Sequence, residues 1–140
     1  MLPPTEDRVL LNTPDHVNRR IHQRSREAVH AAALGGTSGI ARRLAELDRE
    51  WDIERVLEAN AASLVVAGCV LGAVAHRRFF LLPALVGGFL LQHALQGWCP
   101  PLPVLRRLGV RTAAEIEEER DLLLAVRDEL LSPAHAPSAQ

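Results

Sequence analysis

The pattern of apolar and charged positions divides the chain around one long apolar stretch, residues 56–98. Residues 59–75 contain no charged side chain, and in residues 79–98 the only histidine or charged side chain is His93. A polar break, His76-Arg77-Arg78, separates the two runs. Each run approaches the roughly 20 apolar residues that a helix needs to cross a bilayer. The pattern therefore predicts two transmembrane helices joined by a short turn.

Helices that are apolar on every side fit lipid better than they fit the core of a soluble domain. A core helix of a soluble protein keeps a polar face, and neither run has one. The large apolar residues that surround the two helix axes are Leu64, Val65, Val66, Val70, Leu71, Val74, Phe79, Leu81, Leu82, Leu85, Val86, Phe89, Leu90 and Leu91. The rest of a chain of 140 residues holds too little apolar sequence to cover both runs. We therefore interpret residues 56–98 as a transmembrane helical hairpin in an all-α fold.

Charged helices are expected ahead of the hairpin, in residues 13–55, after a flexible segment of residues 1–12. No apolar run in this first segment is long enough for a cleaved signal peptide, so the first membrane helix would serve as an uncleaved signal. The triplet Thr13-Pro14-Asp15 is a helix-start signal, and the helix should end near Leu34, before two glycines. Its four arginines suit anionic lipid headgroups, but its thin apolar stripe favours simple packing on its neighbour.

A second charged helix should begin after residues 37–39. Ile40, Leu44, Leu47 and Trp51 recur every three or four residues and form one apolar stripe, which suits the preceding helix or a second copy of the chain. Mixed charges on the other faces are typical of a solvated surface. Because no proline or glycine separates this helix from the apolar run, we expect it to continue directly into the first membrane helix.

Small residues in both runs allow close packing of the two spans. Gly68 and Gly72 form a GxxxG spacing, and Ala84 and Gly88 repeat that spacing with small side chains. A hairpin that turns at Arg77 would place Gly72 level with residues 83–84 and Gly68 level with residues 87–88. The small faces therefore either meet within one chain or mediate a homodimer.

The same fold would gather polar side chains at the end of the hairpin where both termini lie. The members of this polar layer are Asn60, Ser63, Gln92, His93 and Gln96. Polar groups in lipid are costly and often mark a functional site, His93 above all. They also serve as ordinary interhelical hydrogen bonds, and we favour this second interpretation.

The arginines near the hairpin indicate its orientation. Those on the side of the termini are Arg42, Arg43, Arg49, Arg55, Arg106, Arg107 and Arg111, against Arg77 and Arg78 in the turn. Because an excess of basic residues stays cytoplasmic, both termini are expected on the cytoplasmic side of the inner membrane. Trp98 and the pair Phe79-Phe80 would serve as aromatic anchors at opposite interfaces.

The segment after the hairpin, residues 99–131, should form a proline-rich turn and a cytoplasmic helix. Three closely spaced prolines end the second span, and Gly109 terminates a short helix. Thr112 and Glu115 form a capping box at the start of the last helix. The tail, residues 132–140, is rich in Pro, Ala and Ser and is expected to be disordered.

The hairpin and the segment behind it resemble a known family. The motif Gly97-Trp98-Cys99-Pro100 closes the second run, and Leu108-Gly109-Val110-Arg111-Thr112 follows it. Together with the two spans, these motifs are similar to the YgaP-like inner-membrane transmembrane domain family, over about residues 53–112. The resemblance implies a bacterial membrane hairpin with both ends cytoplasmic. Some members are fused to a rhodanese sulfurtransferase domain, which nothing here resembles, and stand-alone members have no established activity.

Two cysteines carry the candidate chemistry. Cys69 lies mid-span and should be a small packing residue, whereas Cys99 lies at the cytoplasmic interface. At 1.5 Å per residue their depths differ by roughly 20 Å, beyond the reach of a disulfide. Arg106 and Arg107 would favour a Cys99 thiolate and lipid would favour the neutral thiol, so the sign of the pKa shift stays open. No cysteine or histidine spacing supports a metal site.

The sequence contains no catalytic motif, and a net charge of −1 argues against nucleic acid as a partner. We expect a non-enzymatic membrane anchor or assembly subunit without a cofactor. Besides the lipid bilayer, its candidate partners are a second copy of the chain and a cytoplasmic protein. Two alternatives are open: a sulfur- or redox-handling accessory that uses Cys99, and an oligomeric channel for small solutes that uses the polar layer.

Overall fold

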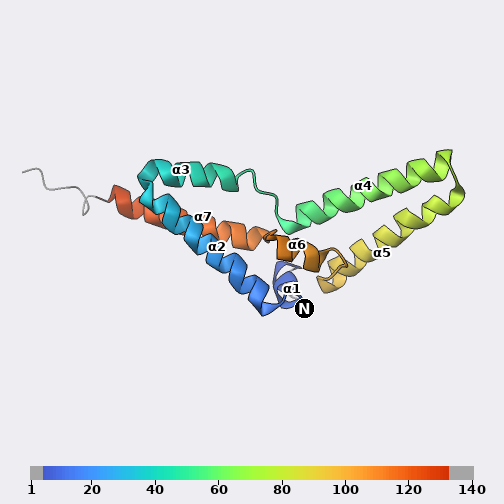
Figure 1. The fold of residues 1–140 in the computed structure, drawn as a ribbon, viewed down its shortest axis with the longest axis horizontal. Coiled ribbons are helices and arrows are strands. Elements are labelled where there is room, and N and C mark those ends of the chain that lie inside the picture. The colour runs from blue at the N-terminus through green and yellow to red at the C-terminus, as the bar shows by residue number, and fades with distance from the viewer. Residues whose placement is uncertain (1–4, 133–140) are drawn as a thin grey trace, which may run out of the picture.

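The structure, a computed structural model, describes residues 5–132 as an all-helical chain (Figure 1). These residues contain no β-strand, which confirms the all-α class for this part of the chain. The helices are α1 (Thr5–Leu11), α2 (Asp15–Leu34), α3 (Gly36–Leu47), α4 (Ile53–Val74), the 3₁₀ helix η1 (Arg77–Phe80), α5 (Leu81–Gln96), α6 (Leu102–Leu108) and α7 (Ala113–Leu131). Of the tail that we expected to be disordered, only Ser132 lies within the described residues.

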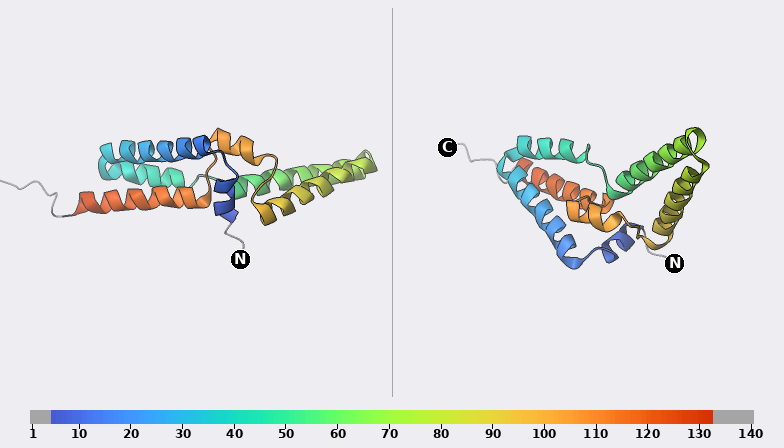
Figure 2. Two further views of the ribbon diagram at one scale, coloured as in Figure 1. Left: turned by 90° about the horizontal axis from the view of Figure 1, so that it is seen from below. Right: turned by 45° about the vertical axis from the view of Figure 1, so that its right-hand side comes forward.

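The helices form a body and an arm. The body contains α1, α2, α3, α6 and α7, and the arm of α4, η1 and α5 extends away from it (Figures 1 and 2). The core between α2, α3 and α7 consists of Ala32, Ile40, Leu47, Ile116 and Leu123. Trp51, which we expected on the α3 stripe, lies beyond the end of that helix, 48% exposed beneath the guanidinium of Arg55. The apolar stripe of α3 thus packs within the body.

The segment between α3 and α4 breaks the continuous helix that the sequence predicted. α3 ends at Leu47, and α4 begins at Ile53. Asp52 caps α4 by accepting a 2.8 Å hydrogen bond from the backbone N–H of Arg55. The N–H of Ile53 donates to the carbonyl of Arg111, also at 2.8 Å. The prediction was wrong because these two acceptors satisfy two of the free N–H groups of α4, so the helix starts here without any proline or glycine.

The N-terminal segment also differs from the prediction. Residues 5–11, which we expected to be flexible, form α1, whereas residues 1–4 lie outside the described residues. Thr13 does not cap α2, because Pro14 occupies the cap position and the Thr13 hydroxyl donates to the carbonyl of Val9 at 2.7 Å. Val9 is fully buried where the arm joins the body. The buried apolar face of α1 therefore ties this segment to the junction.

The predicted start of the last helix is confirmed. Gly109 ends α6 in the left-handed conformation, with φ at 92°. The hydroxyl of Thr112 accepts from the N–H of Glu115, and the Glu115 carboxylate accepts from the N–H of Thr112. This capping box opens α7, which ends at Leu131 as expected.

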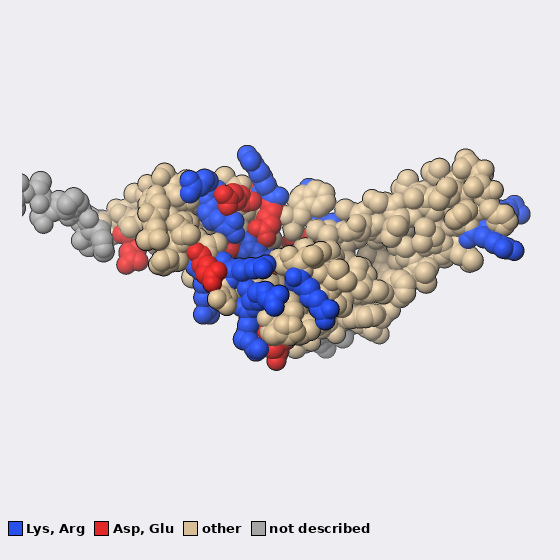
Figure 3. Space-filling view, viewed as in Figure 1, with Lys and Arg blue, Asp and Glu red and all other residues tan. Residues whose placement is uncertain are grey.

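The arm carries most of its apolar side chains on its surface. Its two segments, Ile53–Val74 and Arg77–Gln96, are each long and apolar enough to cross a membrane. On the face shown in Figure 3, basic side chains gather at the far tip of the arm, and most of its length is uncharged. The body, in contrast, carries both acidic and basic side chains (Figure 3).

The two arm helices approach most closely toward the tip. A Cβ atom at Gly68 would lie 2.5 Å from Cδ of Pro83, and one at Gly72 would lie 2.9 Å from ring atoms of Phe80. The predicted register, with Gly68 opposite residues 87–88, is wrong by about one helical turn. The reason is that α4 already ends at Val74, ahead of the expected turn.

The second pair of small residues lies outside this contact. A Cβ atom at Gly88 would meet nothing within 4 Å, and Ala84 is exposed. The close approach of the two helices therefore uses the glycines of α4 against the proline and the aromatic ring at the start of α5.

Replacing Gly68 by alanine tests this contact. The new methyl group would overlap Pro83, so we expect the free energy of unfolding in detergent to fall by about 1–3 kcal/mol relative to a matched variant. That variant is Gly88→Ala, which gains the same helix propensity without a new contact. Thermal unfolding followed by circular dichroism measures the difference, and equal stability of the two variants would contradict the register.

Candidate functional site

The best-defined polar contact within the arm joins Glu54 of α4 to His93 of α5. Nε2 of His93 lies 2.9 Å from Oε2 of Glu54, and the two side chains are 5% and 32% exposed. Nδ1 of His93 and Oε1 of Glu54 are buried without a hydrogen-bond partner among the described residues. The pair fixes the two helices to each other near the body. The sequence singled out His93 and missed Glu54, although Glu54 lies just ahead of the apolar run.

The other members of the predicted polar layer make their hydrogen bonds elsewhere. Asn60 and Ser63 donate to carbonyls four residues earlier in α4, at 2.9 and 2.7 Å. Gln92 donates to Gln96 along α5, at 3.5 Å. Short polar side chains often bond to their own helix in this way. The hydrogen bonds of the described structure therefore do not join these four side chains and His93 into one layer.

Cys99 lies in the apolar junction between arm and body. It is buried with Val9, Ile53, Leu57 and Leu102. Burial raises the pKa of its thiol and outweighs the hydrogen bond from the Leu102 backbone, and the Glu54 carboxylate raises the pKa further. Arg106, which we expected to favour the thiolate, instead binds Glu115. The neutral thiol is thus favoured at Cys99, while Cys69 is an exposed free thiol on α4.

An apolar cleft of about 380 Å³ lies beside Cys99, between the body-side ends of the two arm helices. Leu57 and Leu64 of α4 line one side, and Phe89 and Leu90 of α5 line the other. Pro100 and Pro101 of the turn after α5 also contribute to its wall. Its lining contains no charged side chain, so the cleft offers contact for hydrocarbon rather than catalytic groups.

Arg106 of α6 is one of the two most deeply buried charges of the described residues, with Glu119, at 1% exposure. Its guanidinium binds both carboxylate oxygens of Glu115, at 2.7 and 2.8 Å. The remaining N–H groups donate to Thr13, Asn18 and the carbonyl of Val110. All five donors of the side chain are therefore used. Arg106 joins α6 to α7, to α2 and to the connection between α1 and α2.

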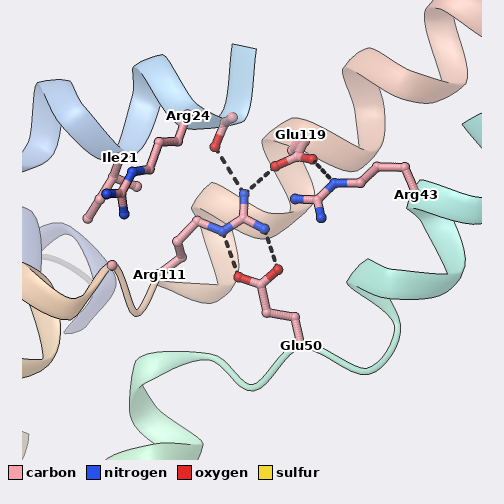
Figure 4. Close-up of a pocket in the computed structure, with 8 residues that line it drawn as sticks. Ile21, Arg24, Arg43, Glu50, Arg111 and Glu119 are labelled. Atoms are coloured by element: carbon pink, nitrogen blue, oxygen red, sulfur yellow. Dashed lines mark hydrogen bonds and ion pairs between the residues drawn. The ribbon is translucent and has the colours of Figure 1, made fainter. Parts of the chain in front are cut away.

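Arg111 is the centre of a second buried group of charges (Figure 4). It forms a fork with both oxygens of Glu50, at 2.7 and 2.5 Å, and it also binds Glu119 and the hydroxyl of Ser25. Glu119 accepts a further 2.7 Å hydrogen bond from Arg43 of α3. Side chains from α2, α7 and the connection ahead of α4 thereby meet at the guanidinium of Arg111, and α3 joins this group through Glu119.

The two buried glutamates stay ionised despite their burial. Burial opposes ionisation of Glu115, but hydrogen bonds from Arg106 and the Thr112 backbone outweigh it and lower the pKa of its carboxyl. The same balance holds for Glu119, where hydrogen bonds from Arg43 and Arg111 outweigh burial and lower the pKa of the carboxyl. Both carboxylates are thus held by arginine partners and are acceptors rather than general acids.

The polar cavity next to Arg111, about 170 Å³ in volume, is lined by these same ion pairs (Figure 4). Glu50, Glu119 and Arg43 point toward Arg111, so their charges are used within the protein. In residues 5–132, no group of three or more His, Cys, Asp or Glu side chains is placed to hold a metal ion. The geometry supports helix packing by these charges rather than chemistry on a substrate.

Sequence reasoning missed the pairing of these arginines. From the sequence, Arg106 was interpreted as a charge near the membrane and near Cys99, Arg111 as a charge and as part of the Leu108–Thr112 motif, and Glu115 as a cap. Their partners come from distant segments, such as Glu50, which lies 61 positions from Arg111. One local signal was available and was not used: Glu115 and Glu119 are spaced by one helical turn, close to the apolar position Ile116.

Comparison with known proteins gives no relative: no protein-family model, no curated protein and no solved structure matches this chain.

The buried glutamates predict an acid-sensitive body. Because the pKa values of Glu115 and Glu119 are lowered in the folded chain, their stabilisation is complete above the unfolded glutamate pKa of about 4.3 and is lost as the pH falls below it. We expect the melting temperature in detergent to fall steeply between about pH 5 and pH 3. Glu119→Gln should flatten this slope and cost about 3–5 kcal/mol at pH 7.

The matched control for that experiment is Glu129→Gln, at an exposed position of the same helix. It should keep both the acid transition and the stability at neutral pH. If Glu119→Gln melts like Glu129→Gln at every pH, the carboxylate of Glu119 does not hold the body together.

The surroundings of Cys99 predict a slow thiol. In a variant that retains Cys99 as its single cysteine, we expect maleimide labelling at pH 7 to be at least ten times slower than at an exposed reference cysteine. Burial limits the access of the reagent, and the raised pKa of the thiol lowers the fraction present as thiolate. The reference is Ala125→Cys, an exposed position of α7, in a chain without native cysteines. Equal rates would restore the possibility of thiol chemistry at Cys99.

Proposed function

We propose that the chain is a small bacterial integral inner-membrane protein of the YgaP-like family. In this proposal the arm is a two-span transmembrane hairpin, and amphipathic helices flank it in the cytoplasm, where both termini lie. The protein acts as a non-enzymatic anchor or assembly subunit that holds its charged body at the membrane for a protein partner. The observation that carries the proposal is the exposed apolar surface of the arm.

This surface covers both arm helices. Its exposed large apolar residues are Leu64, Val66, Val70, Leu71, Val74, Phe79, Phe80, Leu81, Leu85, Leu90, Leu91 and Leu95. Apolar side chains on every side of two helices are typical of lipid contact rather than of a soluble monomer. At 1.5 Å per residue, a helix of the length of α4 reaches roughly 33 Å, enough for a hydrocarbon core of about 30 Å.

The distribution of arginines supports the proposed orientation. The tip of the arm carries Arg77 and Arg78, whereas the other described arginines lie in the body or at its junction with the arm. An excess of basic residues favours the cytoplasmic side, so the body is placed there. With this orientation, the first and last helices of the chain are both cytoplasmic.

The motif on which the family resemblance rests has a clear structural use. Gly109 ends α6, the carbonyl of Arg111 accepts from the first N–H of α4, and Thr112 caps α7. The segment that follows the hairpin is therefore also the segment that positions its first helix. This coupling supports treating the hairpin and the Leu108–Thr112 motif as one unit, as the resemblance implies.

The alternatives have weaker support. A sulfur- or redox-handling role needs a reactive thiol, and Cys99 is buried with a raised pKa. A small-solute channel needs polar groups along a path, and Asn60 and Ser63 bond to their own helix. The buried charges of the body hold its helices together, which suits a rigid platform for a partner.

The topology of the arm tests the proposal in intact bacteria. A reporter enzyme that is active only in the periplasm should be inactive when fused after Gln140 and active when inserted next to Arg77. The protein should also stay in the membrane after alkaline extraction, because two lipid-embedded helices hold it.

The reverse reporter pattern would contradict the orientation, and release by alkali would contradict the membrane location. For the anchor role, purification in mild detergent should yield a complex with a cytoplasmic protein. Conduction of ions or small solutes by the purified chain in proteoliposomes would contradict that role and favour the channel.

A further inference from the structure

We infer that the apolar cleft between α4 and α5 binds one acyl chain of a phospholipid from the leaflet next to the body. This inference rests on the proposed membrane location of the arm and adds a defined lipid site to it. The occupant is a hydrocarbon chain of a bilayer lipid, not a polar metabolite and not a second copy of the protein.

The cleft exists because the two helices diverge toward the body. Near the tip, Gly68 and Gly72 bring α4 against Pro83 and Phe80. Toward the body the helices lie farther apart, as the ribbon shows (Figure 1). The cleft of about 380 Å³ lies between these diverging ends, at the level of Leu57 and Leu64.

The lining of the cleft selects for hydrocarbon. Its walls consist mainly of aliphatic, phenylalanine and proline side chains, with Leu64, Val86, Phe89 and Pro101 among them. Asn60 is the amide in this wall, and its Nδ2 atom already donates to the carbonyl of Val56. A polar ligand would therefore find few groups in this wall to replace its hydrogen bonds to water, whereas an acyl chain needs none.

The position of the cleft points to a bilayer lipid as the source. Its walls continue the exposed apolar surface of the arm, since Leu64 and Leu90 are 48% and 39% exposed. Leu57 and Leu64 lie on the two turns of α4 where the uncharged run starts. In the proposed orientation, these turns are on the body side of the membrane. A cleft that opens to lipid at this depth fills with the acyl chain of a neighbouring lipid. If the cleft stayed empty, the side chains on both of its walls would lose dispersion contacts.

A second copy of the chain suits this space less well than a lipid does. With its side chains an α-helix is roughly 10 Å across, whereas a single extended acyl chain is far thinner. The cleft narrows toward the tip, where Gly68 and Gly72 lie against Pro83 and Phe80. Its tapering shape and its apolar walls therefore favour an acyl chain.

A larger side chain in the wall of the cleft tests the inference. Ala61 lines the cleft, and Ala61→Phe would place a ring in the space of the acyl chain. The matched control is Ala62→Phe, at the next and exposed position of α4. The proteins are reconstituted in vesicles of phosphatidylethanolamine and phosphatidylglycerol, released into mild detergent and weighed by native mass spectrometry.

We expect one retained phospholipid on each wild-type chain and on each Ala62→Phe chain, and at least a fivefold lower occupancy for Ala61→Phe. Equal occupancy in the two variants would overturn the inference, as would a retained free fatty acid, a retained metabolite or a dimer in place of the lipid. If Ala61→Phe does not fold, Val86→Phe fills the cleft from α5, and Leu85→Phe at its exposed neighbour is the control.

Alkaline extraction of the same variants separates this inference from the proposed function. A wild-type chain that remains in the membrane but retains no phospholipid overturns the lipid site and leaves the membrane location intact. A chain that alkali releases overturns both.

Discussion

The buried pair of Arg106 and Glu115 is the interaction on which the body depends. A guanidinium at 1% exposure is stable only when every N–H has an acceptor, and here each of the five has one. Its acceptors come from the connection between α1 and α2, from α2, from the connection after α6 and from α7. Since removal of one partner of a buried pair costs about 3–5 kcal/mol, these elements can move only together. The pair therefore fixes how the short helices at the junction meet the long helices.

Arg111 extends this constraint to the arm. Its side chain holds Glu50 in the connection ahead of α4, and its carbonyl accepts the first N–H of α4. Arg111 thus contacts the segment that leads into α4 through both its side chain and its carbonyl. The exit of α5 is held separately, by the close packing of Gly97 against Arg8 and by hydrogen bonds that Arg8 and Asn12 donate to the carbonyls of Leu95 and Gln96. Both ends of the arm therefore make polar contacts with the body.

Local signals in the sequence predicted much of the helical content. The capping box at Thr112, the glycine that ends α6 and the two apolar runs all depend on residues close in the chain, and the structure contains the corresponding helices. Long-range contacts were not accessible in this way. Arg111 finds Glu50 across 61 positions, and nothing in the local pattern distinguishes Glu50 from other solvated charges. The break at Asp52 was missed for the same reason, because a distant carbonyl helps to start α4.

At the candidate site, too, the sequence indicated single residues but not their distant partners. His93 was recognisable as a costly residue in an apolar run, but its partner Glu54 depends on the register of the two helices. That register is set near the tip, where Gly68 and Gly72 admit Pro83 and Phe80. In lipid no hydrophobic force draws helices together, so such close-fitting residues decide where they touch. Between this tight end and the ends fixed by the body, no comparable set of small residues closes the gap. The apolar cleft therefore lies between two sets of contacts, the close approach of the glycines to Pro83 and Phe80 near the tip and the contacts at the body end of the arm.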